Sequence, residues 1–155
     1  MKLTLPVATV ATLFFASSAY ARCQPCFGGE KWFTLRGDSW PEEINPKNQI
    51  VLSITGDLHT NDVNGNCEVE FAAAAKSKNE MKWKVSLAGA VAPDISLPFV
   101  QSTDKDIKFA TFLPPDLASL GAPSDVQLTV KVSCTVNGNR EPSRVLCVKG
   151  KIRTI

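Results

Sequence analysis

The chain has 155 residues, of which 44% are hydrophobic and 21% charged, and this composition fits one globular domain. Seventeen basic and fifteen acidic residues give a formal net charge of +2, which argues against nucleic acid as the partner. The chain has one histidine, His59, and this excludes every mechanism or metal site that requires two.

The first 21 residues have the layout of a secretory signal peptide. Lys2 precedes an apolar run over residues 3–15, and small residues then lead to Ala19-Tyr20-Ala21, an A-x-A cleavage site. The apolar core of about 13 residues is shorter than the ~20 that span a bilayer, so a membrane anchor is the weaker alternative. We therefore predict a signal peptide over residues 1–21 and one exported domain over residues 22–155. Its expected location is extracellular or in the lumen of the secretory or vacuolar system.

The rest of the chain alternates short apolar-polar runs with turn sequences. The clearest runs cover residues 49–55, 67–71, 81–87 and 125–134. In such a run every second side chain is apolar, which is typical of a strand with one buried and one solvated face. Asn-Gly and Pro-Pro sequences separate the runs. About seven or eight strands at this spacing predict an all-β fold, an immunoglobulin-like β-sandwich of two antiparallel sheets.

Two stretches need a separate interpretation. The alanines at residues 72–75 favour a helix by propensity, but we expect the preceding strand to continue through them and to turn near residues 76–79. Residues 116–120, closed by Gly121, allow one helical turn at most.

Export places five cysteines in an oxidising compartment, where disulfides are expected. An odd number leaves one thiol unpaired. In the final hairpin, the register that sets Val132 opposite Val148 puts Cys134 on the inner face and Cys147 on the outer face, too far apart to bridge. Cys134 would then bridge the inward-facing Cys67, and Cys147 would bridge an N-terminal cysteine. A bulge in the hairpin would instead allow a local Cys134–Cys147 bridge.

Catalytic and metal-binding motifs give little support for an enzyme. The chain has no nucleophile elbow, Walker loop, zincin motif or dinucleotide fingerprint, so we predict a protein without enzymatic activity, cofactor or metal. Asp57 and His59, with Asp62, would make half a metal site at most. Cys23-Gln-Pro-Cys26 has redox spacing, but its place at the expected mature N-terminus favours structural bridging. Arg36-Gly37-Asp38 matches the cell-attachment tripeptide, which an exposed turn explains equally well.

Many apolar residues fall on the predicted inner faces. They are either an ordinary packed core or the lining of a cavity that holds an apolar ligand between two separated sheets. Pattern alone does not separate the two interpretations. The candidates for the lining of such a cavity are Leu52, Ile54, Val69, Phe71, Trp83, Val85, Leu87, Phe99, Phe109, Val130 and Val132.

From Lys31 onward the chain resembles the ML (lipid-recognition) family of secreted β-sandwich proteins, and is similar to its phosphatidylglycerol/phosphatidylinositol transfer proteins. The matching segments, in chain order, are residues 41–46, 49–56, 62–65, 67–71, 113–116, 125–132, 137–138 and 145–147. They look like the family's proline-bearing turn, its successive strands and its closing hairpin. In that family an early cysteine bridges one near the end, which implies a Cys23–Cys147 disulfide and leaves Cys26 as the unpaired thiol.

The resemblance implies a secreted lipid- or sterol-binding or transfer protein that holds its ligand between the sheets. The expected partners are a phospholipid or sterol and, peripherally, the membrane that supplies it. The alternative is an exported effector or adhesion protein with a filled core, which binds a host or cell-surface protein through its surface.

Overall fold

The computed structural model describes residues 23–26, 32–60, 67–75, 78–92, 99–119, 124–135 and 143–155. Within these ranges the chain forms nine strands in two sheets. The larger sheet holds β1 (Cys23–Pro25), β3 (Glu43–Ile44), β5 (Glu68–Ala75), β6 (Lys78–Ser86), β8 (Ser124–Cys134) and β9 (Ser143–Thr154). The smaller sheet holds β2 (Phe33–Ser39), β4 (Ile50–Leu58) and β7 (Ser102–Thr111). Two short helices, α1 (Leu87–Ala90) and α2 (Pro115–Ala118), complete the described structure.

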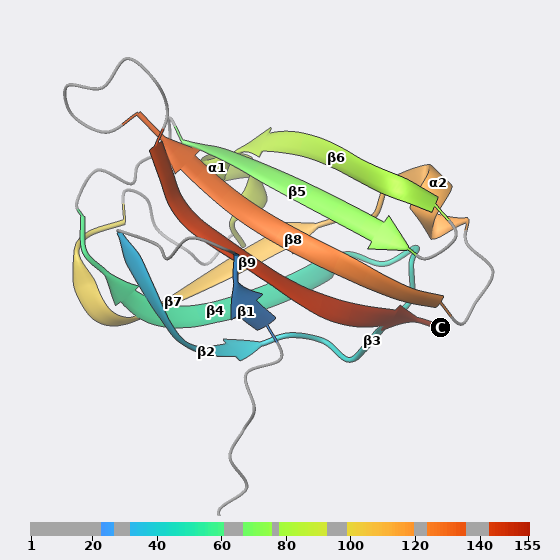
Figure 1. Cartoon of the computed structure of the whole chain (residues 1–155), viewed down its shortest axis with the longest axis horizontal. Helices are drawn as coiled ribbons and strands as arrows, with labels where there is room; N and C mark the ends of the chain where they lie inside the picture. Colours follow the sequence, from blue (N-terminus) through green and yellow to red (C-terminus); the bar gives the residue numbers. More distant parts are fainter. Residues whose placement is uncertain are drawn as a thin grey trace, which may run out of the picture.

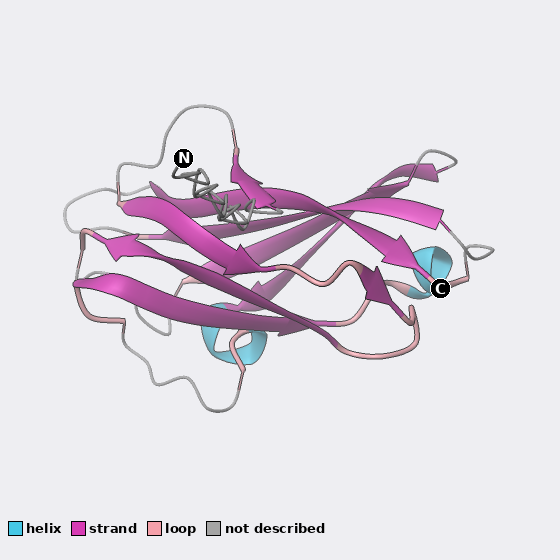
Figure 2. Ribbon diagram, turned by 90° about the horizontal axis from the view of Figure 1, so that it is seen from below, coloured by secondary structure: helices cyan, strands magenta, loops and turns pink. Residues whose placement is uncertain are grey.

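The two sheets pack face to face, as Figures 1 and 2 show from two directions. The larger sheet has the strand order β1-β9-β8-β5-β6 and the smaller sheet β2-β4-β7. Successive strands cross between the sheets from β4 to β5 and from β6 to β7, as in a Greek-key sandwich. All pairs are antiparallel except β3 with β9, which is parallel. The predicted all-β sandwich is confirmed, with nine strands in place of seven or eight.

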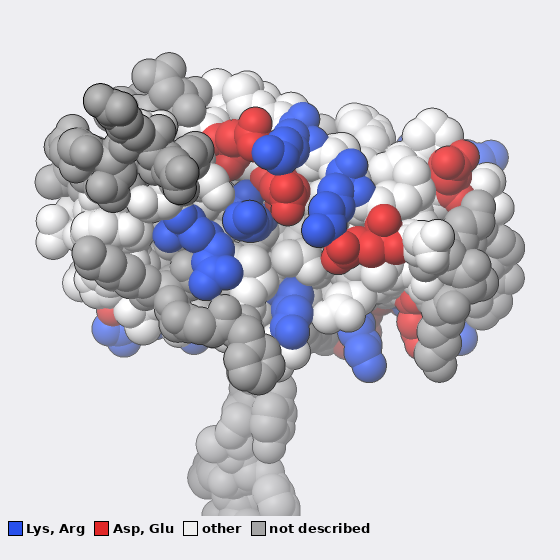
Figure 3. All heavy atoms as spheres, turned by 45° about the horizontal axis from the view of Figure 1, so that its top comes forward, with Lys and Arg blue, Asp and Glu red and all other residues white. Residues whose placement is uncertain are grey.

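The alternation of side chains along each strand builds the core. In β4, Ile50, Leu52 and Ile54 are buried between the sheets, and Val51 between them is 48% exposed. On the outer face of the larger sheet, Lys84 pairs with Glu68 at 2.6 Å. Figure 3 shows basic and acidic side chains interspersed on one face of the molecule. The strands are therefore amphipathic, and the apolar face of each sheet lies against the other sheet.

Three local predictions are tested by the described residues. β5 continues through the alanines to Ala75, as expected, but β6 begins at Lys78, within the turn predicted near residues 76–79. Leu87 does not end β6 but begins α1, because the Ser86 side chain caps this turn by accepting a hydrogen bond from the Gly89 backbone N–H. The β8–β9 register places Val132 opposite Leu146, two residues from the predicted pairing with Val148. This shift of two residues keeps the side chains of β8 up to Val132 on their predicted faces. A bulge follows between Val132 and Ser133, but it pairs Cys134 with Ser143 and not with Cys147.

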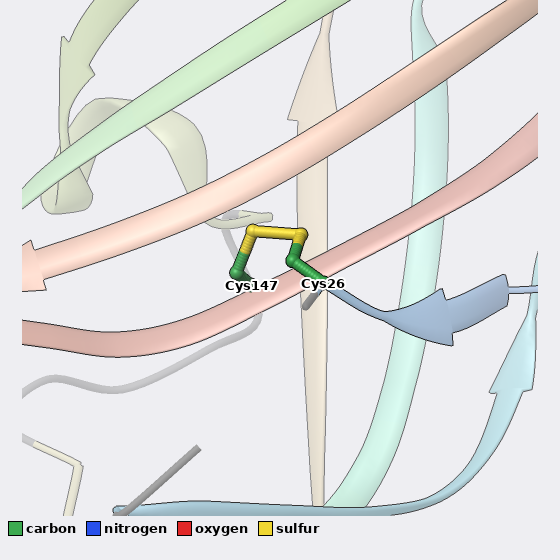
Figure 4. Close-up of a disulfide and its surroundings, with 2 residues drawn as sticks. All are labelled: Cys26 and Cys147. Carbon is green, nitrogen blue, oxygen red and sulfur yellow. A yellow bond between two sulfur atoms is a disulfide. The ribbon is translucent and has the colours of Figure 1, made fainter. Parts of the chain in front are cut away.

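The disulfides correct one predicted pair and confirm the other. Cys67 bridges Cys134 as predicted, and Cys147 bridges an N-terminal cysteine, but that cysteine is Cys26, and Cys23 carries the free thiol. The prediction of a Cys23–Cys147 bridge with Cys26 unpaired is therefore wrong. In the β1–β9 register Cys23 lies opposite Gly150, three residues from Cys147 and on the other face of the sheet. The Cys26 backbone N–H, in contrast, donates to the Cys147 carbonyl at 2.9 Å, and Figure 4 shows the bridge beside β9.

Two disulfides fit an oxidising, extracellular or secretory environment. Among the described residues, no helix has the length and apolar character that crossing a bilayer requires.

Candidate functional site: an apolar pocket between the sheet edges

The structure brings the eleven predicted cavity residues together in the central core. Nine of them are at most 2% exposed, and the inner-face side chains of Trp83 and Val85 on edge strand β6 are only partly buried. Trp83 stacks on Phe71 with ring centroids 5.6 Å apart, and its indole N–H donates to the Thr111 hydroxyl across the sandwich at 3.1 Å. None of the eleven lines either of two pockets that lie elsewhere among the described residues. A ligand at this position would require the sheets to separate, so the role of these residues in binding stays a prediction.

An apolar pocket of about 200 Å³ opens instead between the sheets at the β1–β9 and β2 edges. We call it the edge pocket. It is lined by Pro25 of β1, by Phe33, Thr34 and Leu35 of β2, and by Leu146, Cys147 and Val148 of β9. It therefore draws its walls from both layers of the sandwich.

Strand register explains why this pocket is apolar. Pro25 lies opposite Val148 in the larger sheet, so both side chains share the inner face. In the smaller sheet, Phe33 lies opposite the buried Leu58, and Leu35 lies opposite Gly56. Residues that alternate with the inward positions, such as Thr34 and Cys147, fall on the outer faces of their strands.

Gly56 positions one wall of the edge pocket. A Cβ atom on this residue would lie 2.4 Å from the Phe33 ring and 2.3 Å from the Thr34 carbonyl oxygen. The missing side chain of Gly56 therefore allows β2 and the Phe33 ring to lie directly against β4.

The volume of the edge pocket limits what it can hold. An apolar cavity of ~150 Å³ accepts a benzene-sized guest, whereas sites for drug-sized ligands occupy ~300–1,000 Å³. At about 200 Å³ the edge pocket suits a short alkyl segment or a single ring. Each methylene transferred into it from water contributes about 0.8 kcal/mol.

The second pocket is a wider polar hollow of about 480 Å³ where β4 ends and β7 begins. Two of its polar residues, Asp57 and His59, bond to neighbours on the smaller sheet, whereas the buried Ser102 hydroxyl has no hydrogen-bond partner within the described part of the chain. The Asp57 residue is 7% exposed, and both of its carboxylate oxygens accept from Arg36 Nε, Oδ1 at 2.7 Å and Oδ2 at 2.8 Å. Oδ1 also accepts from the Asp104 backbone N–H at 3.1 Å. These hydrogen bonds hold the pKa of the Asp57 carboxyl below its usual range. His59 Nε2 lies 2.9 Å from the Thr34 hydroxyl. In the described part of the chain, no three His, Cys, Asp or Glu side chains cluster as metal ligands would; Asp62 lies outside the described residues.

The Arg36-Gly37-Asp38 tripeptide lies within strand β2, where the pairing with β4 shifts register between Leu35 and Gly37. The Arg36 guanidinium binds Asp57 in a bidentate ion pair, with Nη2 2.6 Å from Oδ2. The Asp38 carboxylate accepts the Cys23 backbone N–H at 3.2 Å. Both charged side chains therefore stabilise the sandwich, and an adhesive role would have to compete with these contacts.

The free thiol of Cys23 is expected to resist alkylation in the folded protein. Cys23 is 3% exposed, and burial together with the nearby Asp38 charge raises the pKa of its thiol to about 12. Because only the thiolate is nucleophilic, iodoacetamide at pH 9 should leave folded Cys23 unmodified and should modify it fully in guanidinium chloride. Mass spectrometry of both samples checks this. Rapid modification of the folded protein would contradict the described position of Cys23.

The same pKa difference predicts a slope of stability with pH. The folded state keeps the Cys23 proton up to about pH 12, whereas an unperturbed thiol loses it near pH 9.0. The folded state therefore loses stability as the pH rises through this interval, and Cys23→Ala should remove that part of the loss. Urea titrations of both proteins at pH 8 and 10 measure the difference.

The edge pocket was not among the predicted sites. Its apolar members follow the same alternation as the core, but no sequence pattern indicates that β1, β2 and β9 meet. The chain matches no protein-family model and no curated protein sequence.

Proposed function

We propose that the mature chain is an exported protein that binds an apolar ligand of the lipid class, with an alkyl chain or ring in the edge pocket. The observation that carries this proposal is the apolar opening of about 200 Å³ between the two sheets. The signal-peptide layout and the two disulfides support export, and the resemblance to the ML family supports a lipid ligand. The protein would act by binding, without covalent chemistry on the ligand.

Binding of fatty acids of increasing chain length tests this function. Isothermal titration calorimetry with hexanoic, octanoic and decanoic acid should show affinity rising about fourfold per methylene for as long as each added group is buried. The gain should stop once the chain exceeds the length of the pocket. Affinity that does not depend on chain length would contradict an apolar site.

A blocking substitution locates the ligand. Leu35→Trp should fill the edge pocket and abolish decanoic acid binding, because Leu35 is partly buried at its wall. Val51→Trp is the matched control, since Val51 is exposed on the outer face of β4 and its enlargement leaves the pocket unchanged. Equal binding by both variants would contradict the edge pocket as the site.

A second candidate function is an exported interaction protein that acts through its surface. The closed packing of the central core favours it, since nine of the eleven candidate residues are at most 2% exposed. This function predicts that native mass spectrometry of the secreted protein shows its bare mass and that no fatty acid binds in calorimetry. A co-purifying lipid would contradict it.

A further inference from the structure

The Cys26–Cys147 disulfide lies on the outer face of β1 and β9, directly behind the wall that these strands contribute to the edge pocket. Cys147 is one of the lining residues, and Cys26 directly follows Pro25, which contributes the wall from β1. Figure 4 shows the bridge between the end of β1 and β9. The bond thus joins the two strands that form the pocket's wall on the side of the larger sheet.

Apart from Cys23, which is buried in the core, β1 makes few contacts among the described residues. The strand has three residues, and it pairs only with β9, at the edge of the sheet. Its described polar contacts outside that ladder are the Cys26 N–H to the Cys147 carbonyl and the Cys23 N–H to Asp38. Cleavage after Ala21, as predicted, would make Cys23 the second residue of the mature chain. The Cys26–Cys147 disulfide would then attach this N-terminal strand to β9 covalently.

The two disulfides differ in burial. Cys67 and Cys134 are both buried, at 3% and 1% exposed. Cys26 is only partly buried, although its partner Cys147 is buried. A reductant therefore reaches the Cys26 sulfur more easily than the other three bridged sulfurs.

The free thiol of Cys23 does not take part in thiol–disulfide exchange with this bridge. Cys23 points to the inner face, opposite Gly150, whereas the bridge lies on the outer face. Its thiol is also held in the protonated, unreactive form by burial. Opening the Cys26–Cys147 bond therefore requires an external reductant.

We propose that the Cys26–Cys147 disulfide is a redox gate for the edge pocket. An external dithiol transfers two electrons and two protons to the bridge, becomes a disulfide itself, and leaves Cys26 and Cys147 as thiols. β1 then separates from β9, the Pro25 wall moves away, and the ligand exchanges with solvent. This gate rests on the proposed function, because it regulates the same pocket.

Paired disulfide variants test the gate. Cys26→Ser/Cys147→Ser removes the gating bridge, and Cys67→Ser/Cys134→Ser is the matched control that removes one bridge of the same fold. Transfer of radiolabelled decanoic acid from the protein to albumin should be about tenfold faster in the first variant, equal to ~1.4 kcal/mol of barrier. In the control variant the release rate should stay within about twofold of wild type, ~0.4 kcal/mol.

A ligand-free measurement keeps the gate testable if a variant folds poorly. Wild-type protein is treated with limiting dithiothreitol until mass spectrometry shows one bridge reduced, and peptide mapping identifies it. Hydrogen exchange at Gln24 should then become faster, while exchange in the β5–β8 ladder stays unchanged.

The outcomes are distinguishable. If oxidised wild type binds decanoic acid and both variants release it at the wild-type rate, the gate is overturned and the proposed function stands. If oxidised wild type binds no probe, the proposed function fails and the gate fails with it. Preferential reduction of Cys67–Cys134, or unchanged exchange at Gln24, would also overturn the gate.

Discussion

Replacing Phe71 by alanine is expected to lower the free energy of unfolding by about 3–5 kcal/mol, the largest loss that we predict for a single substitution. Phe71 is fully buried at the middle of β5, opposite Val130 on one side and Trp83 on the other. Its ring stacks on Trp83. Deleting it would leave a cavity at the centre of the sandwich that its strand neighbours cannot close without breaking their ladders.

Urea unfolding followed by tryptophan fluorescence measures this loss. The matched control is Val51→Ala, which removes apolar atoms from an exposed position on β4 and should cost less than about 0.5 kcal/mol. A cost for Phe71→Ala close to that of the control would mean that the sheets do not pack tightly here. Such a result would support the central cavity that the sequence predicted.

The second large effect is expected for Gly56→Ala, at about 1–3 kcal/mol or more. The new Cβ would lie 2.3 Å from the Thr34 carbonyl oxygen and 2.4 Å from the Phe33 ring, so either β2 or the ring must move. Since Phe33 lines the edge pocket, the same change should also weaken decanoic acid binding. One methyl group would thus lower both stability and affinity.

Gly37→Ala is the control for this substitution. Gly37 lies on strand β2, and a Cβ atom on it would meet no atom within 4 Å. Urea midpoints and calorimetric titrations of the two variants separate the effects. Wild-type stability and affinity in Gly56→Ala would contradict the close contact of β2 with β4.

The sequence predicted most of the sandwich because the period-two pattern survives along β4 and β8, although residues 71–73 of β5 and 145–148 of β9 are buried without alternation. Residues 125–134 alternate as predicted, and β8 covers Ser124–Cys134 with its apolar side chains buried. The Cys67–Cys134 pair followed from the same rule, since inward-facing cysteines can meet only inward-facing cysteines.

What the sequence did not predict depends on contacts between distant segments. β1 and β3 have three and two residues, too few to show a periodic pattern, and both form by pairing with β9. The residue pattern therefore did not tell Cys23 from Cys26, and the family resemblance favoured Cys23; the β1–β9 register places Cys23 on the inner face and Cys26 on the outer face. α1 depends on one side-chain cap at Ser86, which a strand-like pattern conceals.

The sequence predicted the candidate site in the central core, whereas the edge pocket is lined by other apolar residues. The cause is again a contact between segments that are distant in the chain. Alternation identifies which side chains point inward, but it does not tell a filled layer from an open one. Phe33 and Leu35 line one pocket with Leu146 and Val148 because β2, the edge strand of the smaller sheet, lies near β1 and β9 at one edge of the larger sheet. The opening arises from this tertiary arrangement.

A crystal structure with a bromine-labelled decanoic acid tests the central claim most directly. We predict an anomalous bromine peak within the edge pocket, in contact with Phe33, Leu35 and Leu146, and unchanged packing around Phe71. A bromine peak between separated sheets, beside Leu52 and Val130, would contradict this site and restore the central cavity. No bound acid at saturating concentration would contradict the binding function itself.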